Sequence, residues 1–221
     1  MVVLATKVYV AGDARDRALD GLESMVANTL DGLDVTVEVG HRDDDFPTVT
    51  VEGDDEVVAR NLLREEWGEI TPHLEAGEVH VGTLESWDDD GFVLDAGQRV
   101  RIPADQLGLG QGSPEQIRTR FGLVQHIPLR FVAGDPPRLA DEEQDRLYEW
   151  TRGTGRLNIN SATRSEVRAT VNRAGHAQDI VTVERLGLLE QSVVCREGTD
   201  PPGLLASVGE YLPAELLCVV P

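Results

Sequence analysis

The stretch from Val81 to Leu107 constrains the fold more than any other region of this sequence. It reads VGTLESWDDDGFVLDAGQRVRIPADQL, in which short apolar and β-branched runs are separated by turns rich in Asp and Gly. A further run of this kind, HIPLRFVAG, lies downstream. Short strands at this spacing are typical of a small antiparallel barrel. We therefore predict a central OB-like β-barrel over residues 77–135.

One short helix is expected inside this barrel segment, over SPEQIRTRFGL. Ser113 is a good N-cap, Pro114 suits the first helical position, and Gln116 completes a capping box. The neighbouring run from Gly108 to Gly112 has three glycines, but no lysine follows it and no βαβ unit surrounds it. It therefore matches neither the P-loop nor the dinucleotide-binding fingerprint. We interpret that run as a loop of the barrel.

The segment before the barrel, residues 1–76, predicts an α+β sandwich in the order β-α-β-β-α. KVYVAG, from residue 7, predicts the first strand, and ARDRALDGLESMVANTLDGL predicts a helix that ends near Gly32. DVTVEVG and PTVTVEG alternate with period two and predict a hairpin. Asp54 or Asp55 can cap the second helix. Its expected apolar face consists of Val57, Val58, Leu62, Leu63 and Trp67.

The segment after the barrel, residues 136–221, begins beyond a linker, AGDPPR, with a helix over LADEEQDRLYEWTRG. The patterns that follow predict β-α-β-β-α-β, the order of a ferredoxin-like domain. Thr163 and Glu166 form a capping box, and Asp200 caps the last helix. The overall fold class is therefore α+β throughout.

The two cysteines test this topology. Cys195 falls on the third strand of the last segment and Cys218 on the fourth, with the first strand between them. At the spacing of neighbouring strands their Cα atoms lie ~9–10 Å apart, beyond the reach of a disulfide. We predict two reduced thiols.

The charge pattern is unusual. The chain has 40 acidic and 20 basic residues, and Lys7 is the only lysine. A net charge of −20 with so little lysine resembles the proteins of halophilic archaea, which keep molar salt inside the cell. In molar salt the Debye length is only ~3 Å, so an acidic protein is not barred from binding nucleic acid. The sequence has no apolar run of membrane-spanning length and no signal peptide, and we expect a cytoplasmic protein without a membrane partner.

The charge is also uneven along the chain. Residues 1–76 hold 18 acidic and 6 basic residues, whereas the stretch from Arg99 to Arg196 holds 14 arginines and 12 acidic residues. Arginine binds phosphate with two donors and stacks on bases. An anionic partner would therefore meet the second half of the chain, unless these arginines serve only as surface salt bridges.

The barrel stretch resembles the S-one-type RNA-binding OB barrel over about residues 79–133. Gly82, Gly91, Gly97 and the run from Val100 to Pro103 carry the match. In such barrels an aromatic residue usually precedes the Gly of strand two, another lies two residues after it, and a His-Ile-Ser follows in strand three. Here these positions hold Asp90, Val93 and Arg101-Ile102-Pro103. Base stacking contributes ~1–3 kcal/mol per base, so much of that affinity is missing. Trp87 either stacks on a base in place of the missing aromatic residues or packs in the core of the barrel. Phe92 is expected in the core.

The whole chain resembles an archaeal three-domain family known only as a domain of unknown function. The stretches RFGL and AGHAQDIVTVERLGLLEQSVVCREGTDPPGL, together with the barrel stretch, carry this resemblance. It implies three domains and no assigned activity, so no catalytic residues transfer with it.

No motif predicts catalysis, a metal or a cofactor. The five histidines are scattered, and the two Asp triplets, at 43–45 and 88–90, lack the spaced ligands of a calcium loop. The leading hypothesis is a non-enzymatic RNA-binding or RNA-associated factor of the translation or transcription machinery. The alternative is a protein-interaction adaptor, and a weaker third is an enzyme with a site between domains. The residues expected to contact RNA are Trp87, Arg99, Arg101, Arg118, Arg120, Arg130, Arg156, Arg164 and Arg168.

Overall fold

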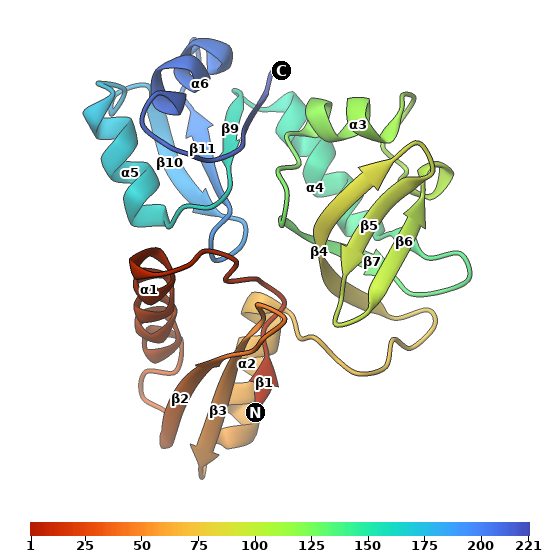
Figure 1. The fold of residues 1–221 in the computed structure, drawn as a ribbon, viewed down its shortest axis with the longest axis vertical. Helices are drawn as coiled ribbons and strands as arrows, with labels where there is room; N and C mark the ends of the chain where they lie inside the picture. Colours follow the sequence, from red (N-terminus) through yellow and green to blue (C-terminus); the bar gives the residue numbers. More distant parts are fainter.

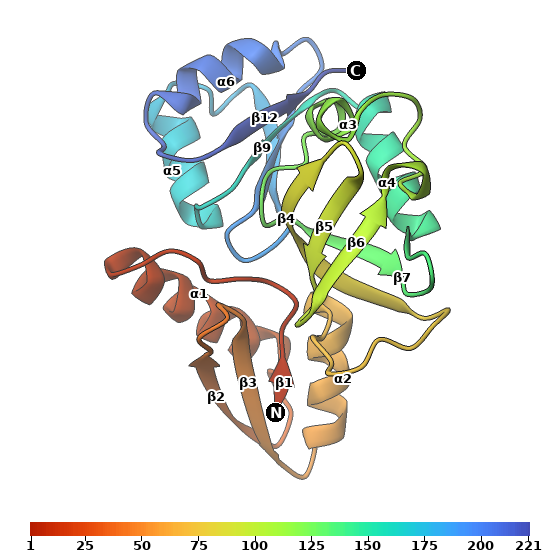
Figure 2. The same ribbon diagram turned by 45° about the vertical axis from the view of Figure 1, so that its right-hand side comes forward.

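A computed structural model describes all 221 residues and contains three antiparallel sheets and six α-helices (Figure 1). The sheets follow one another along the chain, so the molecule has an N-terminal, a central and a C-terminal region. Figure 2 shows the same three regions grouped around a common junction.

The N-terminal sheet has the order β1-β3-β2. The predicted hairpin is confirmed, since β2 (Val35–His41) pairs with β3 (Pro47–Gly53) along its whole length. Helices α1 (Asp13–Thr29) and α2 (Glu56–Trp67) pack on this sheet.

Two expectations for the N-terminal region were wrong. The first strand is β1 (Val2–Val3), not the stretch from residue 7, because residues 7–10 form no strand and bond to other regions of the molecule. On α2, Val57 and Val58 are 66% and 49% exposed, and Ala59 is buried in their place. The helix packs with a narrower apolar stripe than the sequence pattern predicted.

The central sheet is curled into a half-barrel with the order β6-β5-β4-β7-β8. Its strands are β4 (Val79–Asp88), β5 (Gly91–Asp95), β6 (Arg99–Pro103), β7 (Pro128–Val132) and β8 (Arg138–Leu139). A 3-10 turn at Ala104–Gln106 and helix α3 (Pro114–Phe121) lie between β6 and β7. The predicted capping box of α3 is present, with Ser113 and Gln116 bonded reciprocally.

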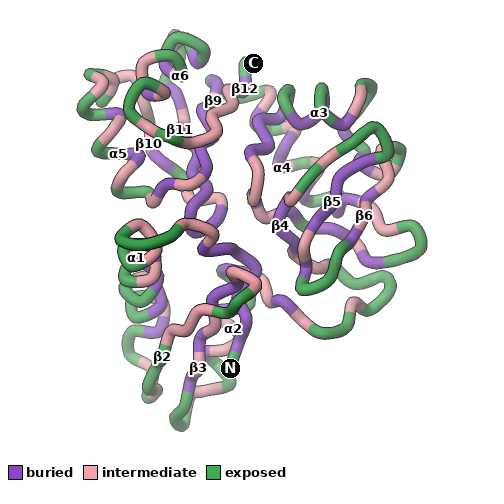
Figure 3. Tube along the Cα trace, viewed as in Figure 1, coloured by how far each residue is buried: buried purple, intermediate pink, exposed green.

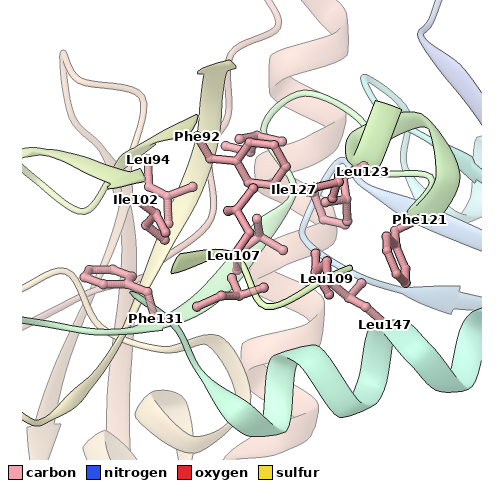
Figure 4. Close-up of a cluster of buried hydrophobic side chains, with 14 of the residues drawn as sticks. Phe92, Leu94, Ile102, Leu107, Leu109, Phe121, Leu123, Ile127, Phe131 and Leu147 are labelled. Atoms are coloured by element: carbon pink, nitrogen blue, oxygen red, sulfur yellow. The ribbon is translucent and has the colours of Figure 1, made fainter. Parts of the chain in front are cut away.

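Helix α4 (Asp141–Arg152) packs on this half-barrel. Leu147 and Trp150 of α4 share one core with 18 other buried residues, among them Phe92 as predicted. Figure 4 shows Leu147 among the half-barrel side chains, close to Leu109 and Phe121. Strand β8 and helix α4 therefore complete the central core, although composition alone grouped them with the last segment.

The C-terminal sheet has the order β10-β11-β9-β12. Its elements follow the predicted β-α-β-β-α-β order: β9 (Arg156–Ile159), α5 (Arg164–Arg173), β10 (Ile180–Arg185), β11 (Gln191–Cys195), α6 (Pro201–Gly209) and β12 (Leu216–Val219). Thr163, Glu166 and Asp200 cap their helices as predicted. Cys195 and Cys218 lie on β11 and β12, both paired with β9, and both thiols are free.

The loop between β10 and β11 joins the regions together. Its residues Leu188 and Leu189 are buried in the core of the N-terminal region, and the Leu188 amide donates a 2.8 Å hydrogen bond to Thr6 Oγ1. Figure 3 shows that this loop and the chain after β1 are buried where the three regions meet. The junction is thus a packed interface, and its rim positions the side chains described next.

Candidate nucleic-acid interface

A cleft opens at the rim of this junction. It has a volume of about 400 Å³ and is lined by α2, β4, β7, α4 and Leu186. A neighbouring hollow of about 460 Å³ shares Arg146 and Leu186 with it and reaches β9, β10 and α5. We call the two together the junction cleft.

Arginines from all three regions line the junction cleft. One comes from α2 of the N-terminal region, two come from β7 and α4 of the central region, and three come from the C-terminal region. They are Arg64, Arg130, Arg146, Arg156, Arg164 and Arg185. Six glutamates line it as well, so the cleft is formally neutral within a chain of charge −20. It is therefore far less acidic than the protein as a whole.

Buried tryptophans hold several of these guanidinium groups in place. The Arg185 guanidinium lies 3.8 Å from the ring centre of Trp67, and Arg146 and Arg156 lie 5.1 and 5.2 Å from that of Trp150. Both tryptophans are almost fully covered, at 7% and 4% exposure. Stacking fixes the planes of the arginines, and the rings themselves offer no open face to a base.

Four of the six arginines are paired with carboxylates. Arg64 bonds to Glu69 at 2.6 Å and Arg185 to Glu66 at 2.5 Å. Arg146 and Arg156 bond to glutamates of their own regions, Glu143 and Glu184. The side chains of Arg130 and Arg164 are exposed and have no such partner. These two have all their donors free for an incoming anion.

A second polar cluster, half-buried, joins the N-terminal and central regions at the junction. Lys7 Nζ lies 2.8 Å from Asp95 and 3.1 Å from Glu85, and Glu85 also contacts His126 Nδ1 at 3.3 Å. Burial alone would raise the pKa of Glu85, but hydrogen bonds from His126 and Thr83 lower it to about 2. Burial likewise opposes the charge of Lys7, yet its bond to Asp95 raises its pKa overall.

The same cluster contains the half-buried Tyr9 and the buried Glu190. The Tyr9 ring lies 4.0 Å from that of His126, and its hydroxyl donates to Glu190. Complete burial raises the pKa of Glu190 to about 8, and burial raises that of Tyr9 as well. None of these residues lines the junction cleft, so we assign the cluster to holding the three regions together.

Three family models match the chain from end to end. The DUF2110 N-terminal domain matches residues 1–73, the DUF2110 central domain residues 74–151 and the DUF2110 C-terminal domain residues 154–220. The chain belongs to the DUF2110 family. The central-domain match includes β8 and α4, in agreement with their packing on the half-barrel. No curated protein matches the sequence.

None of the six α-helices is long and apolar enough to cross a membrane. No three His, Cys, Asp or Glu side chains gather in a way that could hold a metal ion.

The structure brings three of the nine predicted contact residues into the junction cleft. These are Arg130 of the DUF2110 central domain and Arg156 and Arg164 of the C-terminal domain. Arg168 is exposed one helical turn beyond Arg164. Their contact with RNA stays a prediction.

Two predicted residues lie on the half-barrel wall. Along β6, Val100 and Ile102 point inward, and Arg99 and Arg101 point outward as expected. Arg99 is exposed, whereas Arg101 makes a two-point ion pair with Asp88 at 2.6 and 2.8 Å. This pair raises the pKa of Arg101 and lowers that of Asp88.

The other three residues have contacts within the protein. Arg118 is only 6% exposed and donates to Leu123 O and Glu215 Oε1. Its guanidinium covers the Trp87 ring at 3.8 Å, and the other side of this half-buried tryptophan packs on the central core. Arg120 donates to backbone carbonyls of the loop between β6 and α3. Trp87 and Arg118 thus cover one another at the contact between α3 and β12.

Sequence reasoning missed Arg64, Arg146 and Arg185 and the two tryptophans beneath them. For Arg146 a signal existed, because Glu143, Arg146 and Trp150 share a helix face at spacings of three and four. For Arg185 none existed, since its partners Glu66 and Trp67 lie more than a hundred positions away.

Proposed function

We propose that this protein binds RNA in the junction cleft and catalyses no reaction. The observation that carries the proposal is the convergence of six arginines from three domains on one cleft of a strongly acidic protein. Arg130 and Arg164 have no carboxylate partner there, and a phosphate backbone would supply their counter-charge.

The free guanidinium groups of Arg130 and Arg164 supply the first contacts. Each can donate two parallel hydrogen bonds to one phosphate, a geometry that lysine cannot match. Arg130 belongs to the central domain and Arg164 to the first turn of α5, so one RNA backbone would contact two domains at once. The Trp-backed arginines between them present fixed planes with little entropy left to lose.

The cleft has no exposed aromatic ring on which a base could stack, and this favours folded RNA over a single strand. Trp67 and Trp150 are covered, and the usual aromatic positions of the half-barrel wall hold Asp90 and Val93, with Arg101 where a histidine is usual. A single strand would gain little from base stacking here. We therefore propose folded RNA, recognised through its phosphates and shape.

Two finer fold assignments belong to the same proposal. We assign the half-barrel to the S-one type of OB fold and the C-terminal domain to the ferredoxin-like fold, from their strand orders and the Gly82, Gly91 and Gly97 match. The S-one resemblance favours RNA of the translation or transcription machinery as the partner.

Binding of a fluorescent RNA hairpin, followed by anisotropy across a KCl series, tests the proposal. We expect Arg130→Glu and Arg164→Glu each to weaken binding about tenfold and to flatten the salt dependence by roughly one phosphate contact. Arg99→Glu is the matched control, because Arg99 is an exposed arginine of the central domain outside the cleft. Loss of binding in Arg99→Glu alone would place RNA on the barrel wall instead. A native complex that survives nuclease would favour the protein adaptor.

A further inference from the structure

The outer edge of the N-terminal sheet is an unprotected strand. β2 is the last strand in the order β1-β3-β2, so one side of its backbone pairs with nothing. In Figures 1 and 2 no other element lies beyond it.

The other sheet edges carry devices that discourage pairing. β1 and β8 are two residues long, β12 has four residues, and β10 is interrupted by a register shift. β6 presents two outward arginines and ends at a proline. β2 runs seven residues in unbroken register, without proline, lysine or arginine. Proteins usually protect an exposed strand edge against pairing with another chain. The absence of such protection on β2 therefore favours a partner that pairs with it.

The backbone of β2 shows which groups are free. The Arg42 amide donates to Phe46 O, in register with the β2–β3 ladder. Because bonded pairs alternate along an antiparallel ladder, Thr36, Glu38 and Gly40 bond to β3. The N–H and C=O groups of Val37 and Val39 therefore point away from the sheet, where an added strand would meet them.

An apolar groove runs beside this edge. It lies between α1 and β2, has a volume of about 570 Å³, and is floored by Leu30, Leu33, Val35, Val37 and Val39. Val37 lies on the helix-facing side of the strand together with the packed Val35 and Val39, yet it is 39% exposed. The groove thus leaves uncovered apolar surface next to free backbone groups.

The acidic residues around the groove favour an occupant with basic side chains. Glu23, Asp31 and Glu38 line it, and no basic residue does. A second copy of this chain would bring another acidic domain, with 18 acidic against 6 basic residues in 1–76, onto the same edge. An extended segment with basic side chains has the complementary charge.

We infer that β2 docks an extended segment of a partner protein in which apolar and basic residues alternate. The segment adds a fourth strand to the sheet through Val37 and Val39. Its apolar side chains cover the groove on the α1 side. Its basic side chains fall on the opposite side of the strand, next to Glu38, and Glu23 and Asp31 add to the negative potential that attracts them. This edge is separate from the junction cleft, so the docking stands whether or not the cleft binds RNA.

The test uses the full chain and a blocked eight-residue peptide of alternating valine and arginine. We expect saturable binding by anisotropy and slowed hydrogen exchange at the Val37 and Val39 amides. Val37→Pro removes an outward N–H and blocks an added strand without breaking the β2–β3 ladder, and should weaken binding at least tenfold. Val37→Thr, which keeps the amide and the branched shape, should stay within about twofold of the native chain. Unchanged thermal unfolding of both variants confirms that they are folded.

Several results would overturn the inference. A peptide of the same composition, with its valines and arginines in two blocks, must bind at least tenfold more weakly, and equal binding means that charge alone is at work. Binding to Val37→Pro as tight as to the native chain removes β2 from the site. Self-association of the native chain that Val37→Pro abolishes, seen by sedimentation, means that a second copy is the occupant.

Discussion

Tyr9 Oη lies 2.6 Å from Glu190 Oε1 and joins residues 181 positions apart. The same hydroxyl accepts a 2.9 Å hydrogen bond from the Ser161 amide, so one phenol of the N-terminal domain satisfies two groups of the C-terminal domain. Together with Lys7, which bonds to the central domain, it fixes the three domains relative to one another. These contacts join the three domains at the junction.

Removing this hydroxyl should destabilise the whole protein. In Tyr9→Phe, the buried Glu190 loses a donor and the half-buried Ser161 amide loses its acceptor. A buried polar group left without its partner costs about 1–3 kcal/mol. We expect the free energy of unfolding, measured with urea, to fall by an amount in that range. A change below about 0.3 kcal/mol would show that the contact does not hold the domains together.

Glu190 should make stability depend on pH. Its pKa is raised from an ordinary 4.5 to about 8, so the folded state keeps a proton that the unfolded state has lost. The stabilisation is complete below pH 4.5 and is lost as the pH rises to about 8, with a slope of about −1.4 kcal/mol per pH unit. Glu190→Gln stays neutral and should lack this slope. Parallel stability curves for the two proteins between pH 5 and 8 would contradict the burial of a protonated Glu190.

The Arg118–Glu215 pair should matter for stability and not for RNA binding. Glu215 accepts from the buried Arg118 and from the Gln125 amide at 2.6 Å. Glu215→Gln removes the nearer counter-charge of the buried Arg118 and leaves only Glu115 at 3.5 Å, at a cost of about 1–3 kcal/mol. RNA affinity at a temperature where the variant is folded should match that of the native chain. A tenfold loss of affinity there would mean that α3 belongs to the binding surface.

The two thiols should react at different rates. Cys195 is buried, and burial raises its pKa to about 11, whereas Cys218 is only half-buried. Iodoacetamide at pH 8 should therefore label Cys218 first in the native protein and both residues after unfolding, because the thiolate is the reacting form. Equal labelling of the native protein would contradict the packing of β11.

Local interactions made some elements of this fold predictable. The Ser113–Gln116 and Thr163–Glu166 capping boxes act within three residues, and the β2–β3 hairpin follows from period-two alternation across a short loop. The predicted strand at residue 7 failed because Lys7 and Tyr9 find their partners in the other two domains. An alternating apolar pattern does not distinguish a strand from a buried connecting segment.

The residues of the junction cleft were likewise only partly predictable from the sequence. An excess of arginine pointed to the second half of the chain, and Arg130, Arg156 and Arg164 do line the cleft. Their grouping with Arg64 and Arg185 depends on how the β10–β11 loop inserts into the N-terminal core. Contacts between domains leave no periodic signal in one sequence, which is also why the sequence pattern did not predict the burial of Arg118.

Ultraviolet crosslinking in native lysate at molar KCl tests RNA binding in the junction cleft most directly. After digestion, mass spectrometry would identify the peptides that carry nucleotides, with a known RNA-binding protein of the same lysate as positive control. We predict adducts on peptides that contain Arg130, the stretch from Arg146 to Arg164, and Arg185. Adducts confined to the β6 wall around Arg99, or none while the control is labelled, would contradict the proposal.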